Sequence, residues 1–451
     1  MDKRELLKTF SFEDALFMVV GNMVGTGIFA TAPLLLKFAP STGDALLLWA
    51  FAGYICFSGA MCFTELALLI PNSGSEGIYI KNGFSFLDQR IGKTLGYLFS
   101  WTAIVLMKPA SLAVMCDIFS IYFISVFTSE STVFKIKFLS LSLMSLLSLI
   151  ANYSTFLSKN VNNTMFYIKC CLVSWIILAG LFANVFNREL CQGDINFDRD
   201  TNNSASYAQM LTIGLFDAGF AFDGWNHLNY MASEMKDINS LVKALKVGVP
   251  SVAVSYFLLN MSYFIVLDRN DILKTETVAD VFGMELLGYL GVLVPCFISL
   301  SALGAINGCL LSNSRVIYTA ALQGDIPAVL ANLSVHNTPS FGILLNWILT
   351  CIYIVMGDIG SLLALFSPFY YGFLFLAAAS LIILRFKKPR AAYRVPWYLL
   401  VSFLCASSFL WIVPLILYPL KWFIGLGIIM TGVLVKYLIP DQFYDDTGED
   451  D

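Results

Sequence analysis

The first long apolar stretch of the chain contains the segment Gly21-Asn22-Met23-Val24-Gly25-Thr26-Gly27-Ile28-Phe29. Glycine weakens a continuous helix, and unwound backbone at membrane depth is tolerated only where it is buried in protein or lines a cavity. Close packing of two helices through small residues would explain Gly25 and Gly27 equally well. The segment therefore predicts either a break in a membrane helix or a tight helix contact.

A second apolar stretch contains Gly219-Phe220-Ala221-Phe222-Asp223-Gly224-Trp225-Asn226 and carries a carboxylate at the same relative depth. An ionisable residue inside a membrane span marks a functional site by default. In a five-plus-five inverted repeat, paired discontinuous helices hold the substrate near the midplane. We therefore predict that both stretches are broken helices and that together they form a binding site.

Composition indicates a membrane protein. Of the 451 residues, 58% are hydrophobic and 13% are charged, whereas soluble domains carry roughly 45–50% apolar and about 25% charged residues. So few charges would not cover a soluble globule, and we expect lipid as the outer solvent. No basic block suggests nucleic acid. No cleavable signal peptide is expected, because the charged segment Met1–Phe10 precedes a full-length apolar span.

The pattern predicts twelve spans, given that a crossing helix needs about 20 largely apolar residues. They are Asp14–Lys37, Asp44–Ile70, Thr94–Phe127, Phe138–Ala151, Val161–Phe186, Tyr207–Met231, Val247–Leu267, Leu287–Ala320, Gly342–Met356, Ile359–Leu384, Trp397–Leu417 and Trp422–Ile439. The domain organisation that follows is a cytoplasmic N-terminus (1–13), one twelve-helix membrane domain (14–439) and an acidic cytoplasmic tail (440–451). Within that domain, 14–186 is the first repeat, 207–384 the second, and 397–439 the last two helices.

The basic residues predict the orientation. With the N-terminus inside, cytoplasmic segments hold 17 of the 27 Lys and Arg residues, the other side holds 8, and Lys108 and Lys169 lie within spans. This excess fits the positive-inside rule. We expect a multi-pass protein with both termini in the cytoplasm.

Catalytic and metal chemistry are not indicated. The ten cysteines show neither CxxC nor His-paired spacing, which favours small core hydrophobes over metal ligands or redox centres. Two histidines, His227 and His336, supply no catalytic constellation. The sequence lacks the ring of repeated filter residues that would indicate a channel. We expect no metal, no cofactor and no enzyme activity.

The ends of the two broken helices predict what they bind. Free N–H groups of Thr26, Gly27 and Ile28 would point the positive end of a helix dipole at an anion such as a carboxylate. Carbonyls near Met23 and Phe220 would accept from an ammonium. These two groups together are the backbone of an amino acid.

The same residues resemble a known family. Gly25-Thr26-Gly27-Ile28-Phe29 is similar to the GSGIF-type signature of the amino acid–polyamine–organocation superfamily, with Thr in place of Ser. Phe222-Asp223-Gly224-Trp225-Asn226-His227-Leu228-Asn229-Tyr230, followed by Glu234, resembles the YDGWNxLNYxxEE segment of the L-type amino acid transporters, the light chains of heteromeric transporters. Segments Gly304–Pro327 and Leu384–Pro389 are also similar to this family. The resemblance covers nearly the whole chain.

The resemblance implies a LeuT-type fold, alternating access at the plasma membrane and sodium-independent exchange. It implies that Thr26 and Gly27 hold the carboxylate and that Phe220 is an aromatic gate. It also implies that Lys169 occupies the position at which relatives have a lysine ammonium instead of a sodium ion. A snorkelling lysine is the alternative for Lys169. The predicted substrate-binding set is Met23, Thr26, Gly27, Ile28, Phe220, Ala221 and Asp223, and the gating and coupling residues are Phe220 and Lys169.

The chain departs from the family pattern in three places. The loop Thr128–Ser131 has no Cys for a disulfide to a heavy chain. Non-covalent pairing with a glycoprotein heavy chain stays open, and Cys191 is the remaining candidate for an external disulfide. Met235 replaces the second Glu of the EE pair, and Lys108 stands where some relatives carry Arg. Lys108 either borders the substrate route or pairs with a buried acid.

The predicted substrate class rests on Asp223. Relatives that accept dibasic amino acids carry Asp here, but so do some that carry neutral ones. A carboxylate at a cavity wall must be paired, neutralised or offered to a cation. The alternatives are bonds to unwound backbone N–H groups or a pair with Lys108, and Asp217 would add attraction for cations. We expect exchange of cationic and neutral amino acids; transport of neutral amino acids only, or a transport-inactive sensor of the same fold, are the alternatives.

The sequon at Asn202 predicts external glycosylation.

Overall fold

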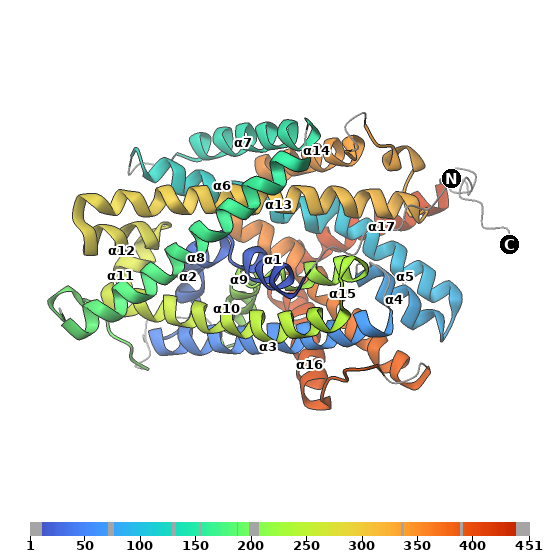
Figure 1. The fold of residues 1–451 in the computed structure, drawn as a ribbon, viewed down its shortest axis with the longest axis horizontal. Coiled ribbons are helices and arrows are strands. Elements are labelled where there is room, and N and C mark those ends of the chain that lie inside the picture. The colour runs from blue at the N-terminus through green and yellow to red at the C-terminus, as the bar shows by residue number, and fades with distance from the viewer. Residues whose placement is uncertain are drawn as a thin grey trace.

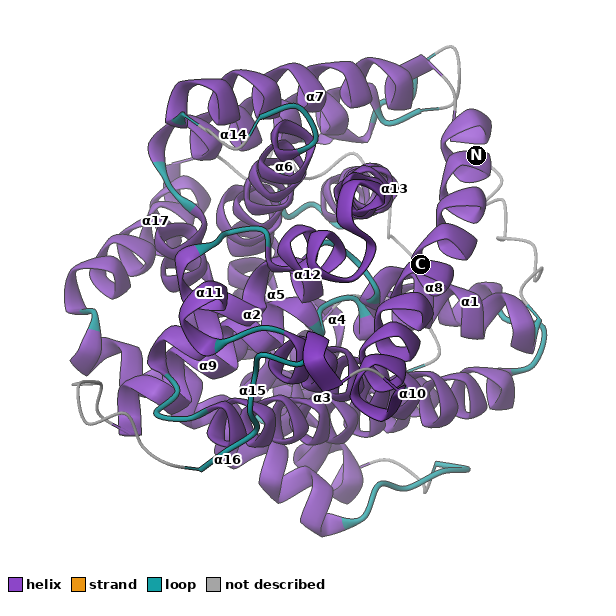
Figure 2. Ribbon diagram, turned by 90° about the vertical axis from the view of Figure 1, so that its left-hand side faces the viewer, coloured by secondary structure: helices purple, strands orange, loops and turns teal. Residues whose placement is uncertain are grey.

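The computed structural model describes residues 11–70, 76–128, 132–153, 155–186, 188–197, 207–334, 338–387 and 391–438. Throughout these ranges the regular structure is helical and contains no strand (Figure 2). This confirms the all-α class predicted from the apolar stretches.

Most helices are long. The first half of the chain forms α1 (Phe12–Met23), α2 (Gly27–Phe38), α3 (Thr42–Leu69), α4 (Glu76–Ser85), α5 (Gln89–Thr102), the π-helix η1 (Ala103–Met107), α6 (Lys108–Ser125), α7 (Val133–Tyr153) and α8 (Thr155–Phe186). The second half begins with the 3-10 helix η2 (Arg188–Leu190), α9 (Tyr207–Ala221), the 3-10 helix η3 (Trp225–Glu234) and α10 (Ile238–Val266). It continues with α11 (Arg269–Lys274), α12 (Val278–Leu287), η4 (Gly288–Val292), α13 (Leu293–Leu322), η5 (Ala328–Ala331), α14 (Ser340–Met356), α15 (Ile359–Lys387), α16 (Trp397–Leu417) and α17 (Pro419–Leu438).

Side-chain caps fix where several helices begin. Ser11 and Asp14 form a capping box at the start of α1, in which each side chain bonds the backbone N–H of the other residue. Asp88 caps α5 and Asp237 caps α10 through their carboxylates. These bonds satisfy N–H groups that have no partner inside the helix.

The described residues contain nine helical segments long and apolar enough to cross a membrane, or ten when α1 and α2 are taken as one bent span. The ninth predicted span is the 17-residue α14, and the sixth is divided between α9 and η3. The count of twelve therefore stays a prediction. Helix α4, which the apolar pattern did not predict, precedes α5.

The broken first span lies near the middle of the molecule (Figure 1). Helices α1 and α2 meet at an angle of 43° across the break. Helix α2 packs against α9, whereas α1 packs against α10 and η3. The two halves of the first span thus contact the two halves of the sixth.

The two ends of the helix bundle carry different connections. Figure 1 places α4 and α5 at one end and α11 and α12 at the other, and Figure 2 looks onto the end with α11 and α12. The topology prediction assigns the first end to the cytoplasm and the second to the outside. We call them the inner and outer ends.

The lateral surface of the bundle, between its two ends, is apolar. On α7, Phe134 is 79% exposed and Leu149 70%, and on α8 Phe182 is 62% exposed. Contiguous exposed apolar side chains of this size mark a membrane-facing surface.

Several predicted features lie outside the described residues. They are most of the N-terminal segment, the loop Ser129–Ser131, the sequon at Asn202 and the acidic tail 440–451.

Candidate functional site

The two predicted helix breaks lie against each other. A Cβ atom built on Gly27 would be 2.7 Å from Ala221 Cα, so only glycine allows the start of α2 to touch the end of α9 this closely. In the sixth span, Gly224 has a φ of 106°, and a Cβ there would be 2.9 Å from the carbonyl oxygen of Asn22. Both glycines are required by backbone contact between the first and sixth spans.

One hydroxyl group joins the two breaks. Tyr256 of α10 donates from its Oη, which lies 2.6 Å from the Met23 carbonyl oxygen and 3.2 Å from that of Ala221. A carbonyl oxygen has two lone pairs, so Met23 retains one acceptor position for an ammonium. Sequence reasoning missed Tyr256, because a tyrosine in an apolar span usually serves as a core aromatic.

The start of α2 has the groups expected of an anion site. The Thr26 side chain is 1% exposed, and its hydroxyl has no hydrogen-bond partner in the part of the chain that the structure describes. Helix α2 begins at Gly27, so the N–H groups of Gly27 and Ile28 belong to its first turn and have no acceptor within the helix. These donors are buried at the point where α2 meets α9.

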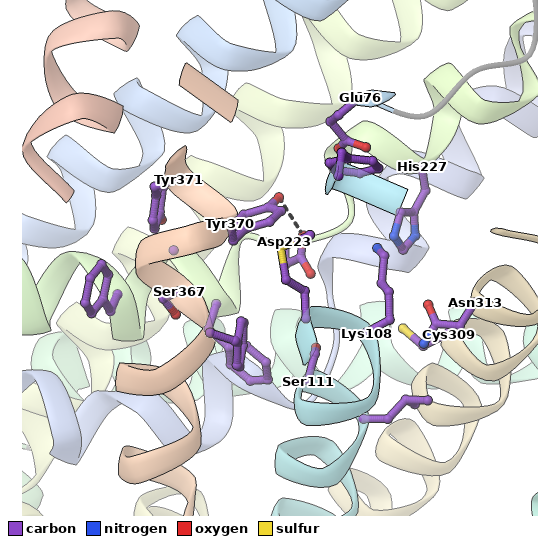
Figure 3. Close-up of a pocket in the computed structure, with 17 residues that line it drawn as sticks. Glu76, Lys108, Ser111, Asp223, His227, Cys309, Asn313, Ser367, Tyr370 and Tyr371 are labelled. Carbon is purple, nitrogen blue, oxygen red and sulfur yellow. Dashed lines mark hydrogen bonds between the residues drawn. The ribbon is translucent and has the colours of Figure 1, made fainter. Parts of the chain in front are cut away.

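A small cavity lies next to the breaks, and we call it the inner cavity (Figure 3). Its volume is about 40 Å³, enough for a few water molecules but not for an amino acid. Of the predicted site residues, only Phe220 and Asp223 line it. Met23, Thr26, Gly27, Ile28 and Ala221 are buried outside it, because α9 is packed directly onto α2.

The wall of the inner cavity comes from distant parts of the chain. Ser367, Tyr370 and Tyr371 come from α15, Lys108 and Ser111 from α6, Cys309 and Asn313 from α13, and Glu76 from α4. Except for Lys108, the sequence reasoning did not select them. The pair Tyr370-Tyr371 next to Pro368 in an otherwise apolar span is the signal that would have found α15.

Asp223 projects into this cavity from the end of the sixth-span break. Its Oδ1 accepts from the Gly224 N–H at 2.9 Å and from the Tyr370 hydroxyl at 3.1 Å (Figure 3). Both bonds go to the same oxygen, and within the described ranges no hydrogen bond to Oδ2 is found. The half-buried carboxylate is thus held by the unwound backbone, as one alternative from the sequence has it, and Asp223 is one of the residues that line the cavity.

Lys169 lies beside the first-span break. The side chain is 4% exposed, and Nζ donates to the carbonyl oxygen of Gly21 at 3.2 Å. The ammonium is therefore buried between α8 and α1. Among the described residues, no group of three or more His, Cys, Asp or Glu side chains is placed to hold a metal ion.

Comparison with known proteins identifies relatives along almost the whole chain. The family model described as "Amino acid permease" matches residues 10–435. The b(0,+)-type amino acid transporter 1 of Mus musculus is 31% identical over 441 residues, which are 96% of this chain and 88% of the relative. The large neutral amino acids transporter small subunit 2 of Homo sapiens is 30% identical, covering 96% of this chain and 80% of the relative. The human Asc-type amino acid transporter 1 is 30% identical, with 96% and 82% covered.

Proposed function

The chain belongs to the amino acid permease family and is an amino acid transporter rather than an enzyme, and we propose that it exchanges cationic together with neutral amino acids across the plasma membrane without sodium. The membership also confirms the relation to the L-type transporters that the sequence predicted. The names of the relatives do not decide the substrate, because relatives with different names have closely similar identities to this chain, 31% and 30%.

Recognition of the amino acid backbone is the first part of the proposal. The buried Thr26 hydroxyl and the first-turn N–H groups of α2 are donors for a carboxylate. The Met23 carbonyl, which keeps one lone pair beside its bond from Tyr256, is an acceptor for the ammonium. All of these groups lie at the first-span break, so one zwitterion bound there would have both of its charged groups satisfied.

Sodium independence rests on Lys169. Its buried ammonium is 3.2 Å from the Gly21 carbonyl and occupies the polar contact that a cation beside the first-span break would use. A fixed positive charge there disfavours a second one.

The observation that carries the cationic preference is the open Oδ2 of Asp223. A carboxylate oxygen at a cavity wall is stabilised by a ligand cation at charge-assisted hydrogen-bond distance. The Gly224 N–H and the Tyr370 hydroxyl fix the orientation of the carboxylate through Oδ1. Oδ2 is therefore presented to the guanidinium or ammonium of a dibasic side chain, whereas a neutral side chain would leave it to water.

A heavy chain is the proposed partner, held without a disulfide at the loop after α6. Both termini are proposed to lie in the cytoplasm, since the basic residues gather at that side. The amino acid and the lipid bilayer are the other partners.

Uptake of labelled arginine and labelled leucine by proteoliposomes tests the substrate class. Asp223→Asn keeps the size of the side chain and the Gly224 contact but removes the charge, so arginine uptake should fall at least tenfold more than leucine uptake, the loss expected for one charge-assisted bond. The exposed Asp194 supplies the matched control, Asp194→Asn, which should change neither. Equal loss of both substrates would mean that Asp223 only holds the helix break. No arginine uptake by the unmodified protein would end the cationic proposal and leave transport of neutral amino acids.

A further inference from the structure

A second and much larger cavity opens at the outer end. Its volume is about 710 Å³, within the range of ligand pockets. Residues of α2, α6, α7, α9, α11, α15 and α17 line it. We call it the outer cavity.

A pair of aromatic rings separates the outer cavity from the inner one. Phe216 of α9 lines both cavities. Its ring stacks on that of Tyr371 from α15, with centroids 5.9 Å apart and planes 16° apart. The two cavities are therefore consecutive along one route, and Phe216 lies at the division.

Asp217, the next residue on α9, lines the outer cavity and is 4% exposed. Within the part of the chain that the structure describes, its carboxylate makes no hydrogen bond and no ion pair. A buried carboxylate without a partner is destabilising unless a cation or a proton neutralises it. Its position at the wall of a cavity makes it accessible to a cation that enters from the outer end.

The other carboxylates that line the outer cavity do not share this condition. Asp117 pairs with Lys137 at 2.5 Å, Asp358 accepts from the backbone and side chain of Ser361, and Glu276 is exposed to solvent. Asp217 alone among these four is both buried and without a partner in the described ranges.

The lysines of the cavity give the charge distribution that a zwitterion would meet. Four lysines line the cavity: Lys137 pairs with Asp117 and Lys421 donates to Ser361. The other two, Lys37 and Lys274, are exposed residues at the last turns of α2 and α11. A carboxylate would be attracted to them, while an ammonium would be repelled toward the deeper Asp217. This distribution orients an amino acid with its ammonium toward Phe216.

We propose that the outer cavity is a separate binding site for incoming substrate, in which the Asp217 carboxylate holds the ammonium group of an amino acid before the molecule passes Phe216. This proposal rests on the proposed transport function but not on a cationic side chain, because every amino acid substrate carries an α-ammonium. A dibasic amino acid offers two groups for the same carboxylate.

The outer cavity lies at the outer end of the bundle, so the test compares the two sides of the membrane. In cells that express the protein, the KM for external leucine is measured by uptake and the KM for internal leucine by exchange efflux. Asp217→Asn should raise the external KM about tenfold, the loss expected for one charge-assisted bond, and leave the internal KM unchanged. Asp194→Asn, which neutralises an exposed carboxylate that does not line this cavity, should change neither value. Asp217→Glu should restore most of the external affinity.

A binding measurement removes dependence on transport. Purified unmodified protein should bind labelled leucine at two sites per chain, and Asp217→Asn at one, with an unchanged or higher melting temperature because an unpartnered charge is gone. An external KM that stays the same, or that rises equally on both sides, overturns the proposal. If the unmodified protein moves no amino acid at all, the transport function fails, and the count of bound leucine still decides the outer site.

Discussion

Replacement of Lys169 tests the reason for sodium independence. Lys169 Nζ is 3.2 Å from the Gly21 carbonyl oxygen. A sodium ion bound to that oxygen at about 2.4 Å, a distance typical of hard cations, would be no farther than about 5.6 Å from the ammonium. Two unit charges at about 5.6 Å repel by about 3 kcal/mol at an effective dielectric constant of about 20. The repulsion lowers sodium affinity roughly 150-fold.

The assay is leucine exchange in proteoliposomes, with choline in place of sodium. The unmodified protein should exchange leucine at the same rate in both salts. Lys169→Met removes the ammonium and should slow exchange while the protein stays folded. Lys169→Arg keeps the charge and should remain insensitive to sodium. Loss of uptake by the unmodified protein in choline would refute the reasoning, as would unchanged exchange by Lys169→Met.

Three further predictions concern packing and linkage. Gly27→Ala forces a methyl group into the end of α9 and should destabilise the protein by about 1–3 kcal/mol and abolish leucine uptake, whereas Gly427→Ala, with open space around it, should do neither. Arg385→Met breaks a buried ion pair with Glu65, whose two side chains are 3% and 2% exposed, and should lower the free energy of unfolding in detergent by about 3–5 kcal/mol. Adding Glu65→Leu to the same chain should recover part of this loss. A double variant that loses the sum of the two single losses would contradict this prediction. A non-reducing gel of native membranes should show no heavier band that disappears on reduction. If such a band appears, the prediction of no disulfide at the loop after α6 holds only when Cys191→Ser removes the band.

Local chemistry made the helix breaks predictable. Glycines and a carboxylate inside an apolar stretch are disfavoured in a continuous membrane helix, so the breaks at Gly25 and Asp223 could be located without any knowledge of packing. The angle between α1 and α2, and the contact of Gly27 with Ala221, follow from how distant helices pack, which no local pattern contains.

Other elements could not be predicted because their sequences lack the expected pattern. Helix α4 carries Glu76, Lys81 and Asn82, so an apolar window misses it. The second half of the sixth span is a 3-10 helix, Trp225–Glu234, and its mixed polarity gives no sign of that helix type. Tyr370 was missed because its role depends on its position opposite Asp223, 147 residues away in sequence.

The contacts of the two breaks limit how the site can open. The inner cavity of about 40 Å³ is too small for an amino acid, so part of its wall must move during transport. Separating α1 from α9 would take the Met23 or the Ala221 carbonyl away from the shared Tyr256 hydroxyl, and a buried carbonyl left without a donor is costly. On the opposite wall, the contact between Phe216 and Tyr371 is a ring stack, which can slide without leaving a polar group unsatisfied. Movement of α15 relative to α9 joins the two cavities at the cost of the Tyr370 bond to Asp223, which an ammonium or guanidinium group of the substrate can replace, and it leaves both helix breaks together around the substrate.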